Sequence, residues 1–198
     1  MKLILASASP RRAEILRDAG FRFEVRPALV DESLRPGEPP GNYVRRLALD
    51  KARATADSLD RTEKCLFIGA DTTVVIEDHI LGKPESDEDA RRMLRRLSGT
   101  AHEVHTGLAL RQECPETERV VEEMTRVTFA PLSDNEIESY IATGEPFGKA
   151  GGYAIQGIGG QYITRIEGCY FNVVGFPLAR FYSLLREFGW EPSGTRNC

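Results

Sequence analysis

The sequence predicts an α/β fold, and three observations support this prediction. The first residues read as a short buried strand that leads directly into a helix, and the segment 65–76 is hydrophobic enough to form a central strand. Segments with apolar residues at helical spacing, such as 42–59 and 86–98, are interleaved with these strands. Because 41% of the 198 residues are hydrophobic, the chain can bury a substantial core. We expect one domain of two lobes over residues 1–189 and a flexible tail over 190–198.

Composition and charge narrow the class of partner and the cellular compartment. The net charge of −4 and the pI near 5.5 argue against broad contact with a nucleic-acid polymer, although a local group of cations can still bind a small phosphorylated ligand. The cysteines are widely separated, with no C-x-x-C pair that would suggest a zinc site. No segment has the pattern of a signal peptide or the length of a membrane span. We therefore expect a protein of the reducing cytoplasm.

The first strand and helix form a candidate anion site. Leu3 to Leu5 read as the strand, Ser9 suits the N-cap position, Pro10 suits the first helical turn, and Gly20 ends the helix. A helix N-terminus offers free backbone N–H groups and a favourable dipole to a phosphate. Side chains that could join them in holding a di- or triphosphate are those of Ser7, Ser9, Arg11 and Arg12. A capped helix with two solvated arginines explains the same residues equally well.

The next two segments offer one acidic residue and one basic residue. After a short strand over 21–25, Glu32 lies in a loop rich in proline and glycine, where it could bind Mg²⁺ or belong to an ordinary surface turn. A long helix is expected over 42–59. It carries Lys51, which helical spacing alone does not distinguish from a solvated lysine.

Asp71 interrupts the most hydrophobic strand of the chain. A carboxylate within such a strand is costly to bury unless a metal ion or a catalytic water compensates it, but a strand end or a bulge at Gly69 is an equally good explanation. A second strand over 79–81 then leads to Lys83, which is held between a glycine and a proline. This lysine could face a ligand phosphate or the solvent.

The middle of the chain is expected to form helices and strands of the fold and to contribute no residues to the ligand site. Ser86 and Asp89 resemble a capping box at the start of the helix over 86–98, whose arginines we assign to a solvated face, and Ser133 with Glu136 begins another helix. Two β-rich runs, over 101–111 and 120–130, are expected to pair antiparallel through a connection at 112–119. His102 and His105 lie three residues apart in the first run. They therefore face opposite sides of a strand, and ordinary hydrogen bonding is expected rather than a shared metal.

A glycine-rich stretch, 148–160, is the second candidate for ligand binding. Its glycines allow the backbone to approach a ligand closely, and the Gln156 amide presents both a donor and an acceptor, as the reading of a base edge requires. The alternative is a flexible connector. A strand over 161–166 and a last helix from Pro177 complete the chain.

Six motifs in this order together resemble the Maf family. They are Ser7-Ala8-Ser9-Pro10-Arg11-Arg12, Gly69-Ala70-Asp71-Thr72, Gly82-Lys83-Pro84, His105-Thr106-Gly107, Gly148-Lys149-Ala150-Gly151-Gly152-Tyr153 and Asn172-Val173-Val174-Gly175. The resemblance implies an inosine-triphosphatase-like α/β fold, with a long mixed β-sheet and two lobes flanking a central cleft. It also implies a homodimer that hydrolyses nucleoside triphosphates to the monophosphate and diphosphate.

The resemblance also suggests a substrate and a role for each residue. Arg11, Thr72 and Gln156 match the branch similar to dTTP/UTP pyrophosphatases, which could extend to modified pyrimidine triphosphates, although many members of that branch have Glu where this chain has Gly82. A sibling branch acts on 7-methyl-GTP. The groups expected to hold the triphosphate are Ser7, Ser9, Arg11, Arg12, Lys51 and Lys83.

Two carboxylates are expected to supply the chemistry. Glu32 and Asp71 would bind a divalent cation, Mg²⁺ or Mn²⁺, and Asp71 would also accept the proton of the attacking water. The competing hypothesis is a non-catalytic nucleotide-binding regulator of septum formation. A pure binder has little reason to place carboxylates among phosphates, because they repel the ligand.

Overall fold

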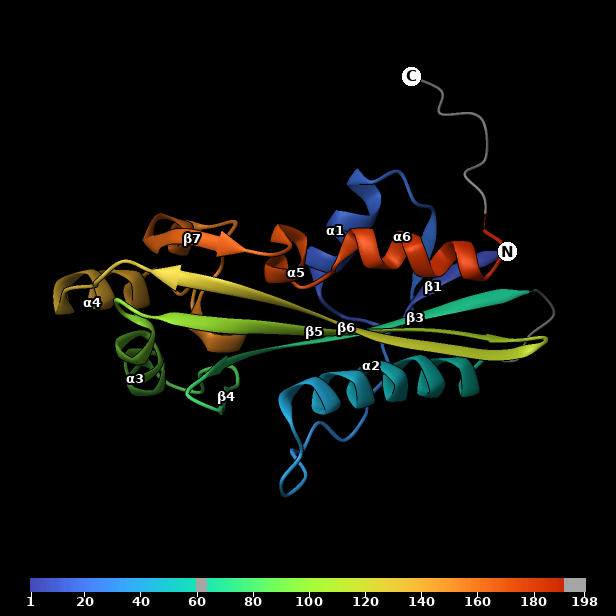
Figure 1. Cartoon of the computed structure of the whole chain (residues 1–198), viewed down its shortest axis with the longest axis horizontal. Helices are drawn as coiled ribbons and strands as arrows, with labels where there is room; N and C mark the ends of the chain where they lie inside the picture. The colour runs from blue at the N-terminus through green and yellow to red at the C-terminus, as the bar shows by residue number, and fades with distance from the viewer. Residues whose placement is uncertain (60–63, 191–198) are drawn as a thin grey trace.

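The computed structural model describes residues 1–59 and 64–190. A seven-stranded mixed sheet runs the length of the molecule, in the order β2-β1-β3-β5-β6-β7, with β4 also paired to β3 (Figure 1). β1 is parallel to both of its neighbours, and the other pairings are antiparallel. The strands are β1 Lys2–Leu5, β2 Phe23–Val25, β3 Cys65–Ile76, β4 His79–Leu81, β5 Ala101–Glu113, β6 Glu116–Phe129 and β7 Ile163–Glu167. The predicted α/β class is confirmed.

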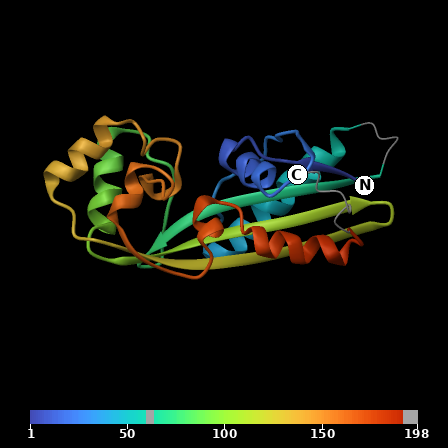
Figure 2. The same cartoon turned by 90° about the horizontal axis from the view of Figure 1, so that it is seen from above.

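Helices cover both faces of this sheet. They are α1 Pro10–Asp18, α2 Pro40–Asp57, α3 Asp87–Leu97, α4 Asp134–Ala142, α5 Tyr170–Val174 and α6 Leu178–Glu187, with short 3₁₀ turns η1 at Ala150–Gly152 and η2 at Ile158–Tyr162. In Figure 1, α2 lies under one face and α1, α5 and α6 lie over the other. Viewed from above, α3 and α4 gather at one end of the long strands and α1 and α6 at the other (Figure 2).

The hydrophobic core is divided in the same way. Alternate residues of β3 point to opposite faces, so that Leu66 and Ile68 pack with α1 and α6 while Phe67 packs with α2. At the other end, α3 and α4 pack with the far parts of β3, β5 and β6, and with Tyr153 and Tyr162. The core of the described residues therefore consists of three clusters, two on opposite faces at one end of the sheet and one at the other end.

Two glycines let α2 approach the sheet very closely. A Cβ atom at Gly69 on β3 would lie 1.9 Å from the backbone oxygen of Ala48, and a Cβ at Gly107 on β5 would meet Val44 in the same way. The register between β3 and β5 is continuous from Leu66 to Val75, so Asp71 lies in the middle of a regular strand. The alternative of a bulge at Gly69 is wrong, because this glycine provides room for the helix.

One edge of β3 is interrupted. β1 pairs with residues 65–68, and β4 pairs with residues 74–76. Since β5 occupies the opposite edge along almost the whole strand, β1 and β4 must share the remaining one. The interval 69–73 between them is open on that side, and it lies at the carboxyl end of β1, where α/β folds commonly bind ligands.

Several expected details of the elements differ in the structure. Ser9 occupies the N-cap of α1, but its side chain makes no capping hydrogen bond within the described residues. Ser86 accepts from the Asp89 amide as expected, but the Asp89 carboxylate accepts from the amide of Glu85, so the capping box is incomplete. The box at Ser133 and Glu136 is complete.

Longer elements also differ from the expectations. The connection expected over 112–119 is largely strand, because β5 and β6 continue to Glu113 and Glu116. The helix α5 was not anticipated. Trp190, assigned to the tail, packs its ring 5.3 Å from that of Phe21, and residues 191–198 of that tail lie outside the described part of the chain.

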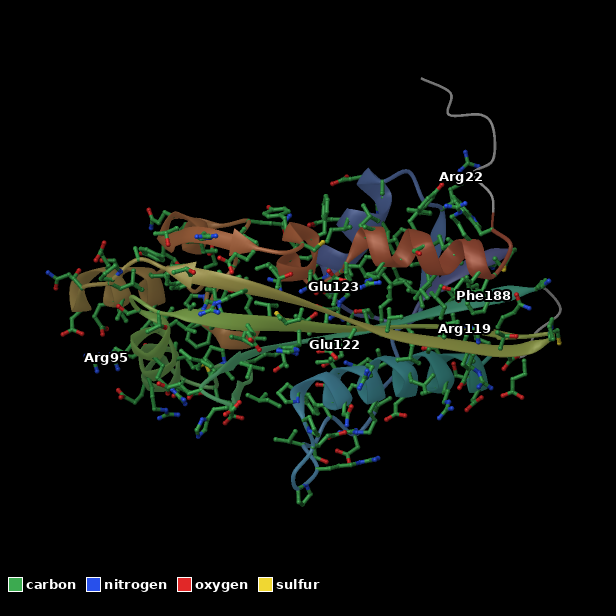
Figure 3. All side chains as sticks on the ribbon, in the orientation of Figure 1. Arg22, Arg95, Arg119, Glu122, Glu123 and Phe188 are labelled. Carbon is green, nitrogen blue, oxygen red and sulfur yellow. The ribbon has the colours of Figure 1, made fainter. Side chains whose placement is uncertain are left out.

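Neighbouring residues of β6 show the two faces clearly. Glu122 and Glu123 point to opposite sides of the sheet (Figure 3). Glu123 accepts from Arg180 of α6, whereas Glu122 bonds with Nδ1 of His105, and His105 also contacts Glu103. This agrees with the hydrogen-bonding role expected for His105.

In the described part of the chain, no helix is both long and apolar enough to cross a membrane.

Candidate active site

A cavity of about 640 Å³ lies at the open interval of β3. The loop from β1 into α1 borders one side, the residues that follow β4 border the other, and α2 and the glycine-rich stretch contribute from opposite faces. This one cavity is lined by every residue that the sequence predicts for the site: Ser7, Ser9, Arg11, Arg12, Glu32, Lys51, Asp71, Thr72, Lys83 and Gln156. The fold therefore brings them together, while their roles stay predictions.

A lysine joins the two carboxylates of the site. The Lys51 Nζ lies 2.7 Å from Asp71 Oδ1 and 2.6 Å from Glu32 Oε1. Lys51 is one helical turn beyond Ala48, where α2 comes closest to Gly69, and Asp71 lies two residues after that glycine on the same face of β3. The close approach of helix and strand therefore sets the Lys51–Asp71 contact.

The Glu32 carboxylate is charged at neutral pH. Partial burial on its own would raise its pKa, but the hydrogen bond from Lys51 and the charges of Lys51, Lys83 and Arg12 outweigh burial and lower the pKa below its ordinary value. Its loop is tied to α2 by Tyr43, whose hydroxyl donates to the Glu32 carbonyl at 2.8 Å. Sequence reasoning did not assign Tyr43 to the site, since it reads as one of the apolar positions of the helix.

Arg12 lies deep beneath the cavity and is bonded mainly to the protein. Its Nε donates to the Gly175 carbonyl at 2.8 Å, and its terminal nitrogens donate to Ala70 O, Ser7 Oγ and Thr72 Oγ1 at 2.8, 3.0 and 3.0 Å. Burial lowers its pKa, which the charges of Asp71 and Glu32 partly offset. Four of the five guanidinium N–H groups are thus engaged. Arg12 brings positive charge to the floor of the site and fixes the Ser7 and Thr72 hydroxyls.

The opening turn of α1 faces the cavity. The Ser9 amide donates to Ser7 Oγ at 3.3 Å, which shapes the turn, and the first amides of the helix have no carbonyl within the helix to accept from them. Arg11 is half-buried at this turn; burial lowers its pKa, and the nearby charges of Glu14 and Glu145 oppose that shift. Lys83 lies across the open interval, directly after β4.

The glycine-rich stretch closes the cavity from the other face. Gln156 is exposed there, and its amide makes no hydrogen bond within the described residues, so it is free to meet a ligand. The Tyr153 hydroxyl bonds with Nε2 of the buried His102 at 2.8 Å. Lys149 also lines the cavity, although it was not assigned to the site; its Nζ donates to the Glu145 carbonyl at 2.6 Å. Its position in a glycine-rich stretch was the one signal that could have found it.

The cavity combines groups suited to phosphate recognition with acid–base groups. Among the described residues, five cationic side chains line the cavity; with a helix N-terminus they can hold a polyphosphate, and the two carboxylates lie beside them. Within the described residues, no group of three or more His, Cys, Asp or Glu side chains could hold a metal by itself. Glu32 and Asp71 nevertheless converge on one cation, the Lys51 ammonium. Two such carboxylates fit Mg²⁺, which keeps several waters and takes further oxygens from substrate phosphates.

Comparison with known proteins gives consistent matches along the chain. A family model described as "Maf-like protein" matches residues 2–188. The dTTP/UTP pyrophosphatase of Koribacter versatilis is 54% identical over 190 residues, covering 96% of this chain and 95% of that protein. The dTTP/UTP pyrophosphatase of Pelotomaculum thermopropionicum is 47% identical, covering 96% and 98% respectively. Among solved structures, a nucleoside-triphosphatase, a dITP/XTP pyrophosphatase from Mycobacterium abscessus, matches with a TM-score of 0.45 and 16% identity, covering 97% of this chain and 100% of that one.

Proposed function

This chain belongs to the Maf family, and we propose that it hydrolyses dTTP and UTP to the nucleoside monophosphate and diphosphate. The observation that supports this most strongly is the Glu32–Lys51–Asp71 cluster, which lies in the same cavity as the phosphate-binding turn and Gln156. Relatives that match nearly the full length of the chain are named dTTP/UTP pyrophosphatases.

The cationic side of the cavity holds the triphosphate. Ser7, Ser9 and the first amides of α1 bind phosphate oxygens, with Arg11 and Lys83 reaching from the two borders of the open interval. Arg12 contributes its charge from below, and Lys51 contributes from α2. Because Ser7, Arg12 and Lys51 are already held by hydrogen bonds, they are in place to stabilise the charge that develops on the departing diphosphate.

Asp71 accepts the proton of the water that attacks the α-phosphorus. Its side chain is only 13% exposed, so the carboxylate is shielded from bulk solvent yet faces the cavity. A divalent cation, Mg²⁺ or Mn²⁺, would be held by Glu32 and Asp71, and when bound it would neutralise phosphate charge. Lys51 contacts both carboxylates from α2.

Gln156 reads the base, with Arg11 and Thr72 beside it. Uracil and thymine present a carbonyl next to a ring N–H, and an amide side chain can satisfy both. The Thr72 hydroxyl is fixed by Arg12 and lies 2.9 Å from the Thr106 hydroxyl, so it offers a rigid contact rather than an adaptable one. These features favour a pyrimidine substrate over 7-methyl-GTP.

The carboxylates also separate an enzyme from a non-catalytic regulator of septum formation. A binder would gain affinity by losing charges that repel a triphosphate, whereas this site holds Glu32 and Asp71 beside the phosphate-binding groups. Family resemblance further supports a homodimer in the cytoplasm. The net charge of −4 favours a small nucleotide over a nucleic-acid polymer as its partner.

A diphosphate-release assay across nucleoside triphosphates tests the function. We expect the highest kcat/KM with dTTP and UTP, and activity that disappears when EDTA is added and returns with excess Mg²⁺ or Mn²⁺. Equal rates with all bases, or highest activity with 7-methyl-GTP, would contradict the assigned substrate. Tight binding of UTP without any turnover in either metal would favour the regulator instead.

A further inference from the structure

Glu145 forms the centre of a hydrogen-bonded cluster beneath the glycine-rich stretch. It follows α4 and is half-buried. Its carboxylate accepts from the Tyr140 hydroxyl at 2.7 Å and from the backbone amides of Ile158 and Gly159, both at 2.9 Å. Neither expected role, phosphate binding or metal binding, accounts for a carboxylate whose three donors all come from the protein.

Tyr140 extends this cluster to the other end of the loop. Its hydroxyl, which donates to Glu145, also accepts from the Ala154 amide at 3.2 Å. One carboxylate and one phenol therefore fix the backbone on both sides of Gln156. Gln156 itself lies between the two fixed points, lines the cavity and leaves its amide free of hydrogen bonds within the described residues.

The glycines of the loop are required by these two side chains. A Cβ atom at Gly157 would lie 2.5 Å from the Glu145 Cδ, and one at Gly159 would lie 2.5 Å from the Tyr140 hydroxyl oxygen. The backbone thus packs directly against the cluster. At these two positions glycine is needed because Glu145 and Tyr140 leave no room for a Cβ atom. A loop with so many glycines has a large conformational entropy when it is not held.

The charges around Glu145 link the cluster to the phosphate side of the cavity. Burial would raise its pKa, but the amides of Gly159 and Ile158, the Tyr140 hydroxyl and the charge of Lys149 outweigh burial and keep the carboxylate ionised at neutral pH. The charge of Glu145 also acts on Arg11, at the start of α1, where it opposes the lowering of the Arg11 pKa by burial.

We propose that Glu145 is a positioning residue for base selection. Together with Tyr140 it holds the loop in the conformation that places the Gln156 amide in the cavity. This inference rests on the proposed nucleotide hydrolysis. Glu145 acts through Gln156 and does not touch the substrate. When the cluster is intact, binding a pyrimidine base does not have to order the loop first, and affinity for that base is higher.

The test is a double-mutant cycle on base selectivity. We would measure kcat and KM with UTP and with GTP for the wild type, Glu145→Gln, Gln156→Ala and the double variant. In Glu145→Gln, the side-chain carbonyl can still accept from Gly159 and Tyr140, but its NH₂ group meets the Ile158 N–H. We expect the UTP-to-GTP ratio of kcat/KM to fall about tenfold, mainly through the KM for UTP. In the Gln156→Ala background the same change should lower the ratio little further.

Two further variants make the result specific. Glu138→Gln is the matched control, because Glu138 lies on α4 and pairs with Arg91 on the surface; its selectivity should equal that of the wild type. Tyr140→Phe removes the hydroxyl alone and should lower the ratio in the same direction by less. It keeps the inference testable if Glu145→Gln does not fold.

Hydrogen exchange supplies a readout that does not depend on turnover. The amide of Ile158, which loses its acceptor, should exchange faster in Glu145→Gln than in Glu138→Gln. Unchanged exchange, or effects of Glu145 and Gln156 that add independently in the cycle, would overturn the inference. If the wild-type protein does not hydrolyse UTP at all, the proposed function fails, and hydrogen exchange still decides whether Glu145 holds the loop.

Discussion

Replacing Gly69 by alanine tests how the backbone places Lys51. The new Cβ would lie 1.9 Å from the backbone oxygen of Ala48, whereas real Cβ contacts stay above 3.0 Å. The helix or the strand must therefore move by about 1.1 Å. A side chain could rotate away, but a helix backbone cannot, so the contact between α2 and β3 has to widen.

This shift acts on the site through Lys51. The Lys51 Nζ is 2.7 Å from Asp71 Oδ1, and a displacement of about 1 Å removes that hydrogen bond and separates the ammonium from both carboxylates. Overpacking of this kind typically costs about 1–3 kcal/mol of unfolding free energy. A misplacement of about 1 Å in a catalytic site can lower turnover by about 10²-fold.

The assay measures urea unfolding and kcat/KM for UTP on the same samples. Gly20→Ala is the control, because Gly20 has φ +81° but no neighbour within 4 Å of a Cβ. Alanine there should cost about 1 kcal/mol of stability through backbone strain and leave kcat/KM unchanged. If Gly69→Ala loses stability but keeps the wild-type kcat/KM, the link between the helix contact and Lys51 is wrong.

Three other substitutions test separate parts of the site and the core. Asp71→Asn should keep the fold, as judged by circular dichroism, and lower kcat about 10²- to 10⁴-fold, since the amide cannot accept a proton; retained turnover would remove Asp71 from the mechanism. Lys83→Ala should lower kcat/KM for every nucleotide alike, and a loss confined to one base would refute a phosphate role. Burial lowers the pKa of His102 to about 4. Between about pH 6.5 and pH 4 the His102 side chain is therefore protonated in the unfolded chain and neutral in the folded chain. The free energy of unfolding consequently falls as the pH falls. Urea unfolding should therefore show the wild type losing about 3 kcal/mol between pH 7 and pH 4 relative to His102→Gln, and parallel pH curves would refute this.

The sequence allowed much of the secondary structure and the composition of the site to be predicted. Helical spacing, capping residues and glycines at chain reversals are local signals, and they located α2, α3, α4 and the strands around Asp71. The turn that includes Ser7 and Arg11 was recognisable for the same reason. Its residues are close in sequence, so the geometry of this turn follows from one strand and one helix start.

The partners of these side chains depend on contacts that are distant in sequence. Arg12 donates to Gly175, 163 residues further along the chain, so nothing near Arg12 indicates that its guanidinium is occupied. Lys51 differs from a solvated lysine only because Gly69 and Gly107 admit α2 to the sheet. Asp71 is explained by that approach together with the interrupted edge of β3, and both are properties of the assembled sheet.

The glycine-rich stretch illustrates the same limit. Its composition predicted close approach of the backbone to a ligand, but at Gly157 and Gly159 the close neighbours are Glu145 and Tyr140. Composition shows that a backbone must approach something closely, and the fold determines what that neighbour is.

The most direct measurement of the central claim is hydrolysis of UTP in ¹⁸O-labelled water, with the products analysed by mass spectrometry. In the proposed mechanism, water activated by Asp71 attacks the α-phosphorus while the cationic groups hold the departing diphosphate. The label should therefore appear in UMP, and the diphosphate should remain unlabelled. Label in the diphosphate, or release of single phosphate groups, would show that the bond broken is a different one and would contradict the proposed arrangement of the site.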